Sequence, residues 1–136
     1  MPKHPHTILM ADDDPEDLDL IEFAITQIEP DADLHKVNNG KAVIEYLAKQ
    51  PDNNLPCLIV LDYNMPELTG SQVLTKICEA KRYDHIPKII LSTSNAAAHI
   101  HECINNGATE YFVKPSTMAA FTDLAKKMLN YCTAAA

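Results

Sequence analysis

The run Leu58-Ile59-Val60-Leu61 is the sequence feature that most constrains the fold. These apolar residues lead directly into Asp62, and Pro66 interrupts the chain soon afterwards. A short apolar run between residues that break regular structure is typical of a strand buried on both faces. In open α/β sheets, ligands bind in the crevice beyond the carboxyl ends of such strands. We therefore expect Asp62 to face a functional crevice.

Other segments of the chain alternate between strand-like and helix-like patterns. The expected strands are residues 7–11, 33–37, 57–62, 86–91 and 110–113, and the expected helices are about 15–28, 41–49, 71–81, 96–105 and 117–131. Residues 33–37 alternate polar and apolar side chains, which is typical of an exposed edge strand. Strands that alternate with helices predict an α/β fold, a doubly wound parallel sheet with helices on both faces. We expect one domain over residues 1–136, with a core at about 6–132 and a frayed tail at 133–136.

Composition limits the class of protein. The chain has 136 residues, 46% of them hydrophobic and 22% charged, as in an ordinary single globular domain. The net charge of −8 argues against nucleic acid as a partner. We expect no membrane span and no secretion signal, and therefore a cytoplasmic protein. The widely spaced Cys57, Cys78, Cys103 and Cys132 do not suit a zinc site, and we expect them to be reduced thiols.

Four of the expected strands lead into or end in polar residues. Asp12 and Asp13 come after the first strand, Asp62 ends the third, Ser92 comes after the fourth and Lys114 comes after the fifth. Parallel topology would bring these strand ends together at one edge of the sheet. Clustered carboxylates repel one another, and a hard divalent cation relieves that repulsion.

The residue types at this edge suit magnesium and phosphate. Asp12, Asp13 and Asp62 would hold Mg²⁺, with the backbone carbonyl of Asn64 as a further ligand. Lys114 would supply a positive charge and Ser92 a hydroxyl donor to a phosphoryl group. Together they suit an aspartyl phosphate on Asp62.

Each residue alone also has an ordinary explanation. Asp13 or Asp14 could be no more than a helix cap, and Asp62 could be a solvated acid in a loop. Ser92 could be a polar turn residue, and Lys114 could be a surface lysine. His99 and His101 lie two positions apart on an expected helix, face different directions, and are expected to be solvated. A functional site is favoured because these acids, the serine and the lysine all fall at matching strand ends.

Three strings of the sequence resemble the response regulator receiver domain of two-component signalling. The first is Ile8 to Pro15, which looks like the opening of that domain. The second is Asp62 to Gly70, which matches the phosphoacceptor motif D-x-x-M-P-x-x-x-G. The third is Gly107-Ala108 followed by Tyr111 to Pro115, which matches the closing motif. The resemblance covers roughly residues 6–132 and implies a flavodoxin-like (βα)5 fold with strand order 2-1-3-4-5.

The resemblance also implies a function. Asp62 would accept phosphate, with Mg²⁺, from a phosphohistidine on a sensor histidine kinase or a histidine phosphotransfer protein. Lys114 would pair with the phosphoryl group, and Ser92 and Tyr111 would be the switch residues. Output would pass through protein contact to a downstream protein target, from a monomer or homodimer. The chain would then be a standalone signalling phosphoacceptor and not an enzyme. The connection from Arg82 to His85 resembles regulators partnered with bacterial phytochromes.

Two other functions compete with this interpretation. A Mg²⁺-dependent aspartyl phosphatase of the haloacid dehalogenase type also uses a strand-end aspartate, but it needs a second acid two residues later, where Asn64 stands. A receiver-shaped docking scaffold that is never phosphorylated is the third possibility. The complete set of acids argues against the scaffold.

Overall fold

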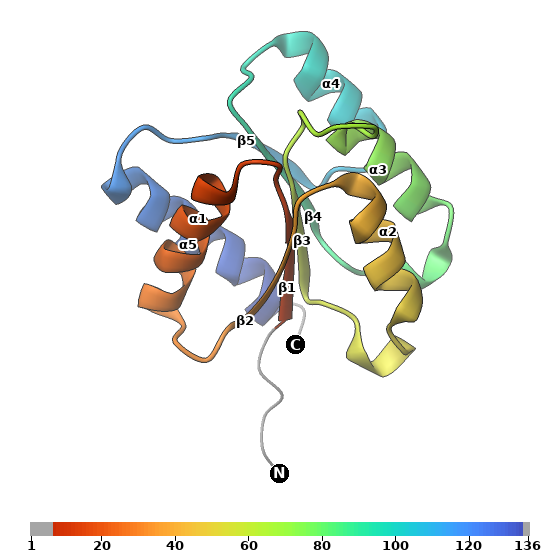
Figure 1. Ribbon diagram of the computed structural model, residues 1–136, viewed down its shortest axis with the longest axis horizontal. Helices are drawn as coiled ribbons and strands as arrows, with labels where there is room; N and C mark the ends of the chain where they lie inside the picture. The colour runs from red at the N-terminus through yellow and green to blue at the C-terminus, as the bar shows by residue number, and fades with distance from the viewer. Residues whose placement is uncertain (1–6, 135–136) are drawn as a thin grey trace.

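A five-stranded parallel sheet lies at the centre of the computed structural model, which describes residues 7–134 (Figure 1). The strands are β1 (Thr7–Ala11), β2 (Asp33–Val37), β3 (Leu58–Leu61), β4 (Lys88–Ser92) and β5 (Glu110–Val113). Their order is β2-β1-β3-β4-β5, and every neighbouring pair is parallel. The predicted fold class and strand order are thus confirmed.

Helices cover both faces of the sheet. They are α1 (Pro15–Ile28), α2 (Gly40–Lys49), α3 (Gly70–Cys78), α4 (Ala97–Asn105) and α5 (Met118–Ala134), with two short 3₁₀ helices, η1 (Asp52–Asn54) and η2 (Lys81–Tyr83). Figure 1 shows α1 and α5 on one side and α2, α3 and α4 on the other. Among the described residues, no helix is long and apolar enough to cross a membrane.

Alternate residues of each central strand pack into two separate cores. Ile8 and Met10 of β1 lie in the core under α1 and α5, whereas Leu9 and Ala11 lie in the core under α2, α3 and α4. This follows from the period of two in a β-strand, whose successive side chains point to opposite faces. Successive residues in the middle of β1, β3 and β4 are therefore apolar on both faces, while β2 at the edge is partly exposed as predicted.

The predicted end of the third helix is wrong. The helix was expected to continue to residue 81, but α3 ends at Cys78 and the backbone of Ala80 is extended before η2 begins. The turn lets the Tyr83 side chain become buried, and it lets the carbonyls of Tyr83 and Ile86 accept hydrogen bonds from the buried Lys88 ammonium, at 2.7 and 2.9 Å. Tertiary contacts here override a helix-compatible sequence.

The end of the chain also differs from expectation. The tail was expected from residue 133, but α5 includes residues 133 and 134, while 135 and 136 lie outside the described residues. No proline or glycine follows Tyr131, so nothing in the sequence ends the helix there.

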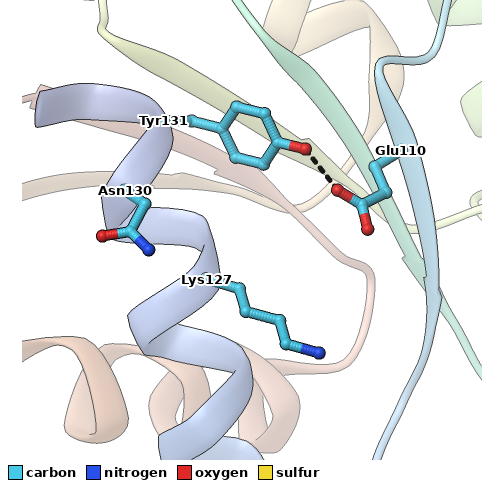
Figure 2. Close-up of a pocket in the computed structure, with 4 residues that line it drawn as sticks. All are labelled: Glu110, Lys127, Asn130 and Tyr131. Atoms are coloured by element: carbon cyan, nitrogen blue, oxygen red, sulfur yellow. Dashed lines mark hydrogen bonds between the residues drawn. The ribbon is translucent and has the colours of Figure 1, made fainter. Parts of the chain in front are cut away.

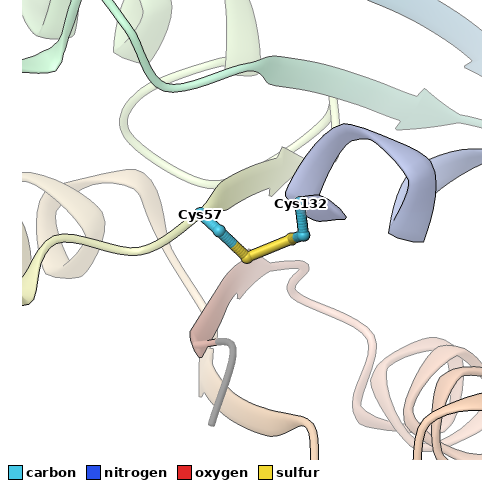
Figure 3. Close-up of a disulfide and its surroundings, with 2 residues drawn as sticks. All are labelled: Cys57 and Cys132. Carbon is cyan, nitrogen blue, oxygen red and sulfur yellow. A yellow bond between two sulfur atoms is a disulfide. The ribbon is translucent and has the colours of Figure 1, made fainter. Parts of the chain in front are cut away.

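A disulfide joins Cys57 to Cys132, so the expectation of four reduced thiols is wrong for this pair (Figure 3). Cys57 immediately precedes β3, Cys132 lies near the end of α5, and their Cα atoms are 5.0 Å apart. The two residues are 75 positions apart in sequence, and only the packing of α5 against the sheet brings them together. Cys78 and Cys103 are free.

Candidate functional site

Three carboxylates meet at the carboxyl ends of β1 and β3. Asp12 and Asp13 directly follow β1, and Asp62 directly follows β3. One ligand oxygen from each lies within 4.8 Å of the others. Asp12 is 3% exposed and Asp62 is 7% exposed, whereas Asp13 is exposed to solvent. The sheet therefore builds the acidic crevice that the strand ends predicted.

Lys114 places its ammonium among carboxylates in this crevice. Its Nζ donates to Asp12 Oδ2 at 2.7 Å, to Asp17 Oδ2 at 2.7 Å and to Asp62 Oδ2 at 3.4 Å. The lysine directly follows β5, and its backbone N–H donates to the carbonyl of Ser92 at 2.7 Å, which fixes its position beside β4. The side chain of Lys114 is only 8% exposed, so solvent screens these ion pairs weakly.

Burial and neighbouring charges perturb the acids and the lysine. Burial, reinforced by the charge of Asp12, raises the pKa of Asp62 to about 7 although Lys114 opposes the change. Burial alone would lower the pKa of Lys114, but its hydrogen bonds to Asp12 and Asp17 outweigh burial and raise that pKa above its usual value. An excess of buried negative charge remains beside Asp62, which favours a bound cation.

The donor set fits a hard divalent cation. Mg²⁺ takes oxygen ligands, usually one or two carboxylates with waters and a phosphate. Asp12, Asp13 and Asp62 offer three carboxylates that converge from two strands. The backbone N–H of Asn64 lies 3.4 Å from Asp62 Oδ1 and closes a turn over the acid. The role of the Asn64 carbonyl as a ligand stays a prediction.

The loop after Asp62 requires a glycine where the motif has one. A Cβ atom on Gly70 would lie 2.5 Å from the backbone oxygen of Asp62, which is closer than real Cβ contacts. The N–H of Gly70 also donates to the carbonyl of Tyr63 at 2.9 Å. The first residue of α3 is thus pressed against the backbone that carries Asp62.

The two predicted switch residues both contact Ser94. Ser92 is fully buried, and its Oγ accepts a hydrogen bond from the N–H of Ser94 at 3.2 Å. The hydroxyl of the half-buried Tyr111 donates to the carbonyl of Ser94 at 2.7 Å. The β4–α4 loop therefore connects the predicted positions, while their switching roles remain predictions.

Sequence reasoning missed the link between the Asp62 loop and α4. The ring of Tyr63 stacks on His99 with centroids 4.2 Å apart, and its hydroxyl donates to Glu102 Oε1 at 3.0 Å. Ser94 Oγ lies 2.7 Å from His99 Nδ1. The expectation that His99 is solvated is therefore wrong, whereas His101 is exposed as predicted. The available signal was the spacing of His99 and Glu102, which places them on one face of a helix.

Sequence reasoning also missed Asp17. Its carboxylate, in the first turn of α1, is as close to the Lys114 ammonium as that of Asp12, at 2.7 Å. The missing signal is spatial, since nothing in the sequence shows how far the Lys114 side chain reaches.

A pocket of about 320 Å³ lies away from these acids, between β5 and α5 (Figure 2). It is lined by Glu110, Lys127, Asn130 and Tyr131, and the Tyr131 hydroxyl donates to the Glu110 carboxylate. Glu110 begins β5, so the pocket opens near the amino ends of the strands, opposite the acidic crevice. Its volume alone does not make it the site of chemistry, because it lacks the converging carboxylates.

Comparisons with solved structures agree with the topology. The phosphorylated cyanobacterial phytochrome response regulator RcpA is 24% identical with a TM-score of 0.85, covering 98% of this chain and 97% of RcpA, a likeness that shows the fold. The response regulator RPA3017 in red light signaling of R. palustris is 28% identical with a TM-score of 0.81, and the match covers 93% of this chain and 92% of RPA3017. The Mn²⁺-bound form of response regulator Rcp1 is 25% identical with a TM-score of 0.78, covering 90% and 91%.

Comparisons of sequence point to the same family. The two-component response regulator ORR5 of Oryza sativa subsp. japonica is 33% identical over 94 residues, which cover 69% of this chain and 68% of ORR5. The two-component response regulator ARR8 of Arabidopsis thaliana is 31% identical over 138 residues, which cover 90% of this chain and 60% of ARR8. Residues 8–126 match the response regulator receiver domain. With this match and the strand order of its sheet, the chain belongs to the response regulator receiver domain family.

Proposed function

We propose that this protein is a phosphoacceptor of a two-component phosphorelay, in which Asp62 receives a phosphoryl group from a phosphohistidine. The single observation that carries the proposal is the convergence of Lys114 with Asp62, Asp12 and Asp13 at one edge of the sheet. The donor would be a sensor histidine kinase or a histidine phosphotransfer protein. Family membership supports this class of partner.

The chemistry is a transfer of one phosphoryl group between two protein side chains. A carboxylate oxygen of Asp62 forms a bond to phosphorus as the bond from phosphorus to the donor histidine nitrogen breaks, and that nitrogen keeps the electron pair. Lys114, whose Nζ lies 3.4 Å from Asp62 Oδ2, would neutralise charge on the phosphoryl oxygens. Mg²⁺, held by Asp12, Asp13, Asp62 and the Asn64 carbonyl, would supply further charge neutralisation when bound. Rcp1, which is 25% identical to this chain, has a Mn²⁺-bound form, and this supports the proposal that the chain binds a divalent metal ion.

The readout would be a change in the surface around α4 and β5. Ser92 would move toward the phosphoryl group, and Tyr111 would fill the space that this movement leaves. Their shared contact with Ser94 supports coupled movement of the two residues. The surface formed by about residues 92–128 would then bind a downstream protein differently. The protein would exist in two conformations, one with the resting surface and one with the changed surface. The phosphoryl group shifts the balance between these conformations only as far as its contacts with them differ in free energy.

Substitution of Asp62 tests the acceptor directly. The wild-type protein, incubated with a small phosphodonor and Mg²⁺, should gain the mass of one phosphoryl group, and Asp62→Asn should gain none. The control is Asp123→Asn, which neutralises an exposed acid on α5 and should label like the wild type. Phosphate uptake that persists in Asp62→Asn would show that another residue is the acceptor. Continuous turnover of a phosphomonoester by the wild type would instead indicate a phosphatase.

The kind of kinase can be proposed more narrowly. RcpA is described as a phytochrome response regulator, and RPA3017 is described as acting in red light signaling. We infer from these likenesses that a phytochrome-type sensor kinase is a suitable donor. Phosphotransfer profiling against the host's sensor kinases should give the fastest transfer from such a kinase, and faster transfer from a kinase of another class would contradict this inference.

A further inference from the structure

Asp17 contacts the lysine of the site without belonging to the cluster of three carboxylates. It lies in the first turn of α1, and its Oδ2 accepts from Lys114 Nζ at 2.7 Å. Its side chain is 25% exposed, whereas that of Lys114 is 8% exposed. A partly solvated acid thus shares an ion pair with a nearly buried ammonium.

The distances show which carboxylates hold the lysine. An ammonium has three N–H donors, and the three contacts of Lys114 are with Asp12, Asp17 and Asp62. The contacts to Asp12 and Asp17 are both 2.7 Å, while that to Asp62 is 3.4 Å and therefore weak. The ammonium is held mainly on the α1 side of the crevice. A phosphoryl group on Asp62 would need N–H donors of the Lys114 ammonium, which in this structure are bound to Asp12 and Asp17.

We propose that Asp17 is a positioning residue that draws Lys114 away from Asp62 in the resting protein and competes with the phosphoryl group for its ammonium. The inference rests on the proposed function and concerns the same site. Asp17 thereby stabilises the unphosphorylated state relative to the phosphorylated one. It acts through Lys114 and does not itself contact the reacting atoms.

This role predicts opposite effects on two ligands. When the charge of Asp17 is removed, Lys114 turns toward Asp12 and Asp62, and the metal site loses negative charge. Mg²⁺ should then bind more weakly. A phosphoryl analogue should bind more tightly when Mg²⁺ is saturating, because Lys114 is free to pair with it and the repulsion from Asp17 is gone. A purely structural role would weaken both ligands or neither.

The test uses calorimetric titration of the full chain. The probes are Mg²⁺ alone, and fluoroberyllate, an analogue of the phosphoryl group, at saturating Mg²⁺. For Asp17→Asn we expect Mg²⁺ affinity to fall and fluoroberyllate affinity to rise, each by a factor of about 3 to 10, the size of a partly screened charge interaction. Asp17→Ser removes the same charge and provides the same test if the asparagine variant folds poorly.

Two further variants separate a local effect from a general one. Asp17→Glu keeps the charge and should return both affinities toward the wild-type values. Asp19→Asn removes one charge from the same helix, at a side chain that is 75% exposed and 3.5 Å from Lys36 Nζ, so it should leave both affinities unchanged. An Asp19→Asn variant that behaves like Asp17→Asn would assign the effect to the general charge of α1 and would overturn the proposal.

The outcomes also distinguish this inference from the proposed function. Affinities that both fall, or that both stay unchanged, in Asp17→Asn overturn the role of Asp17 when the wild type is still phosphorylated on Asp62. A wild-type protein that gains no phosphoryl group in the labelling experiment overturns the proposed function itself.

Discussion

At the scale of one residue, the raised pKa of Asp62 predicts how the stability of the metal-free protein depends on pH. An aspartyl carboxyl titrates near pH 3.9 in the unfolded chain, whereas burial and Asp12 raise the pKa of Asp62 to about 7 in the folded protein. The folded state therefore binds a proton that the unfolded state has released between these values. This contribution to stability is present below about pH 4 and is lost as pH rises through 7.

Asp62→Asn removes this titration and isolates its effect. We expect the variant to be more stable than the wild type by about 1 to 3 kcal/mol at pH 8, and by clearly less at pH 5, where the carboxyl is mostly protonated. The measurement is guanidinium unfolding with a chelator present, at both pH values. The other titrating groups contribute equally to the free energy of unfolding of the variant and of the wild type. Their contributions therefore cancel when the two free energies are subtracted. A difference that is equal at both pH values would mean that the pKa of Asp62 is not raised.

Some site residues could be predicted from the sequence because of their positions in the chain, whereas others could not. Asp12, Asp13, Asp62, Ser92 and Lys114 could be found because each directly follows, or ends, a strand of a parallel sheet. Residues such as Asp17 and Tyr63 could not, because their contacts depend on the direction and reach of side chains between elements. Backbone topology is encoded in local patterns, whereas these contacts are set by tertiary packing.

At the scale of an element, the contacts of Tyr63 hold α4 against the Asp62 loop. The Tyr63 hydroxyl donates to Glu102, while its ring stacks on His99. Burial, reinforced by the bond to Glu102, raises the pKa of this hydroxyl to about 12. The Tyr63 phenol therefore keeps its proton at neutral and mildly alkaline pH, and it remains a donor to Glu102 there.

Tyr63→Phe should loosen α4 while keeping the ring. The lost hydrogen bond should reduce the free energy of unfolding by about 0.5 to 1.5 kcal/mol and speed amide hydrogen exchange in Ala97–Asn105 more than in α1. Tyr46→Phe is the matched control, because Tyr46 lies on α2 and stacks on His35. If exchange in α4 is unchanged in Tyr63→Phe, the hydroxyl does not hold the helix.

Element ends were predictable only where the local chemistry determines them. Asp14 caps α1 through its side chain, which accepts from the N–H of Glu16 at 3.0 Å, and this start agrees with the prediction. The end of α3 could not be found, because the turn at Ala80 serves a buried tyrosine and the buried Lys88 later in the chain. Caps are local signals, whereas such packing acts over distance.

At the scale of the whole molecule, the disulfide adds a connection that the sheet topology does not require. Cys57 and Cys132 join the chain before β3 to the last turns of α5. Spacing in the sequence gave no sign of the pair, because the two cysteines become neighbours only after β3 and α5 have packed together. A bond across 75 residues restricts the unfolded chain and should stabilise the fold by about 2 to 4 kcal/mol.

Cys57→Ser tests this connection. We expect the variant to unfold at lower denaturant concentration than the wild type without reductant, and dithiothreitol should lower the wild type to about the same midpoint. Cys78→Ser, which changes a free and exposed thiol, should leave the midpoint nearly unchanged.

Thiol titration in denaturant provides an independent measurement. Two reactive thiols in the unreduced wild type agree with a bond between Cys57 and Cys132, since Cys78 and Cys103 are the free pair. Four reactive thiols, with a midpoint insensitive to dithiothreitol, would mean that packing alone holds α5 against β3.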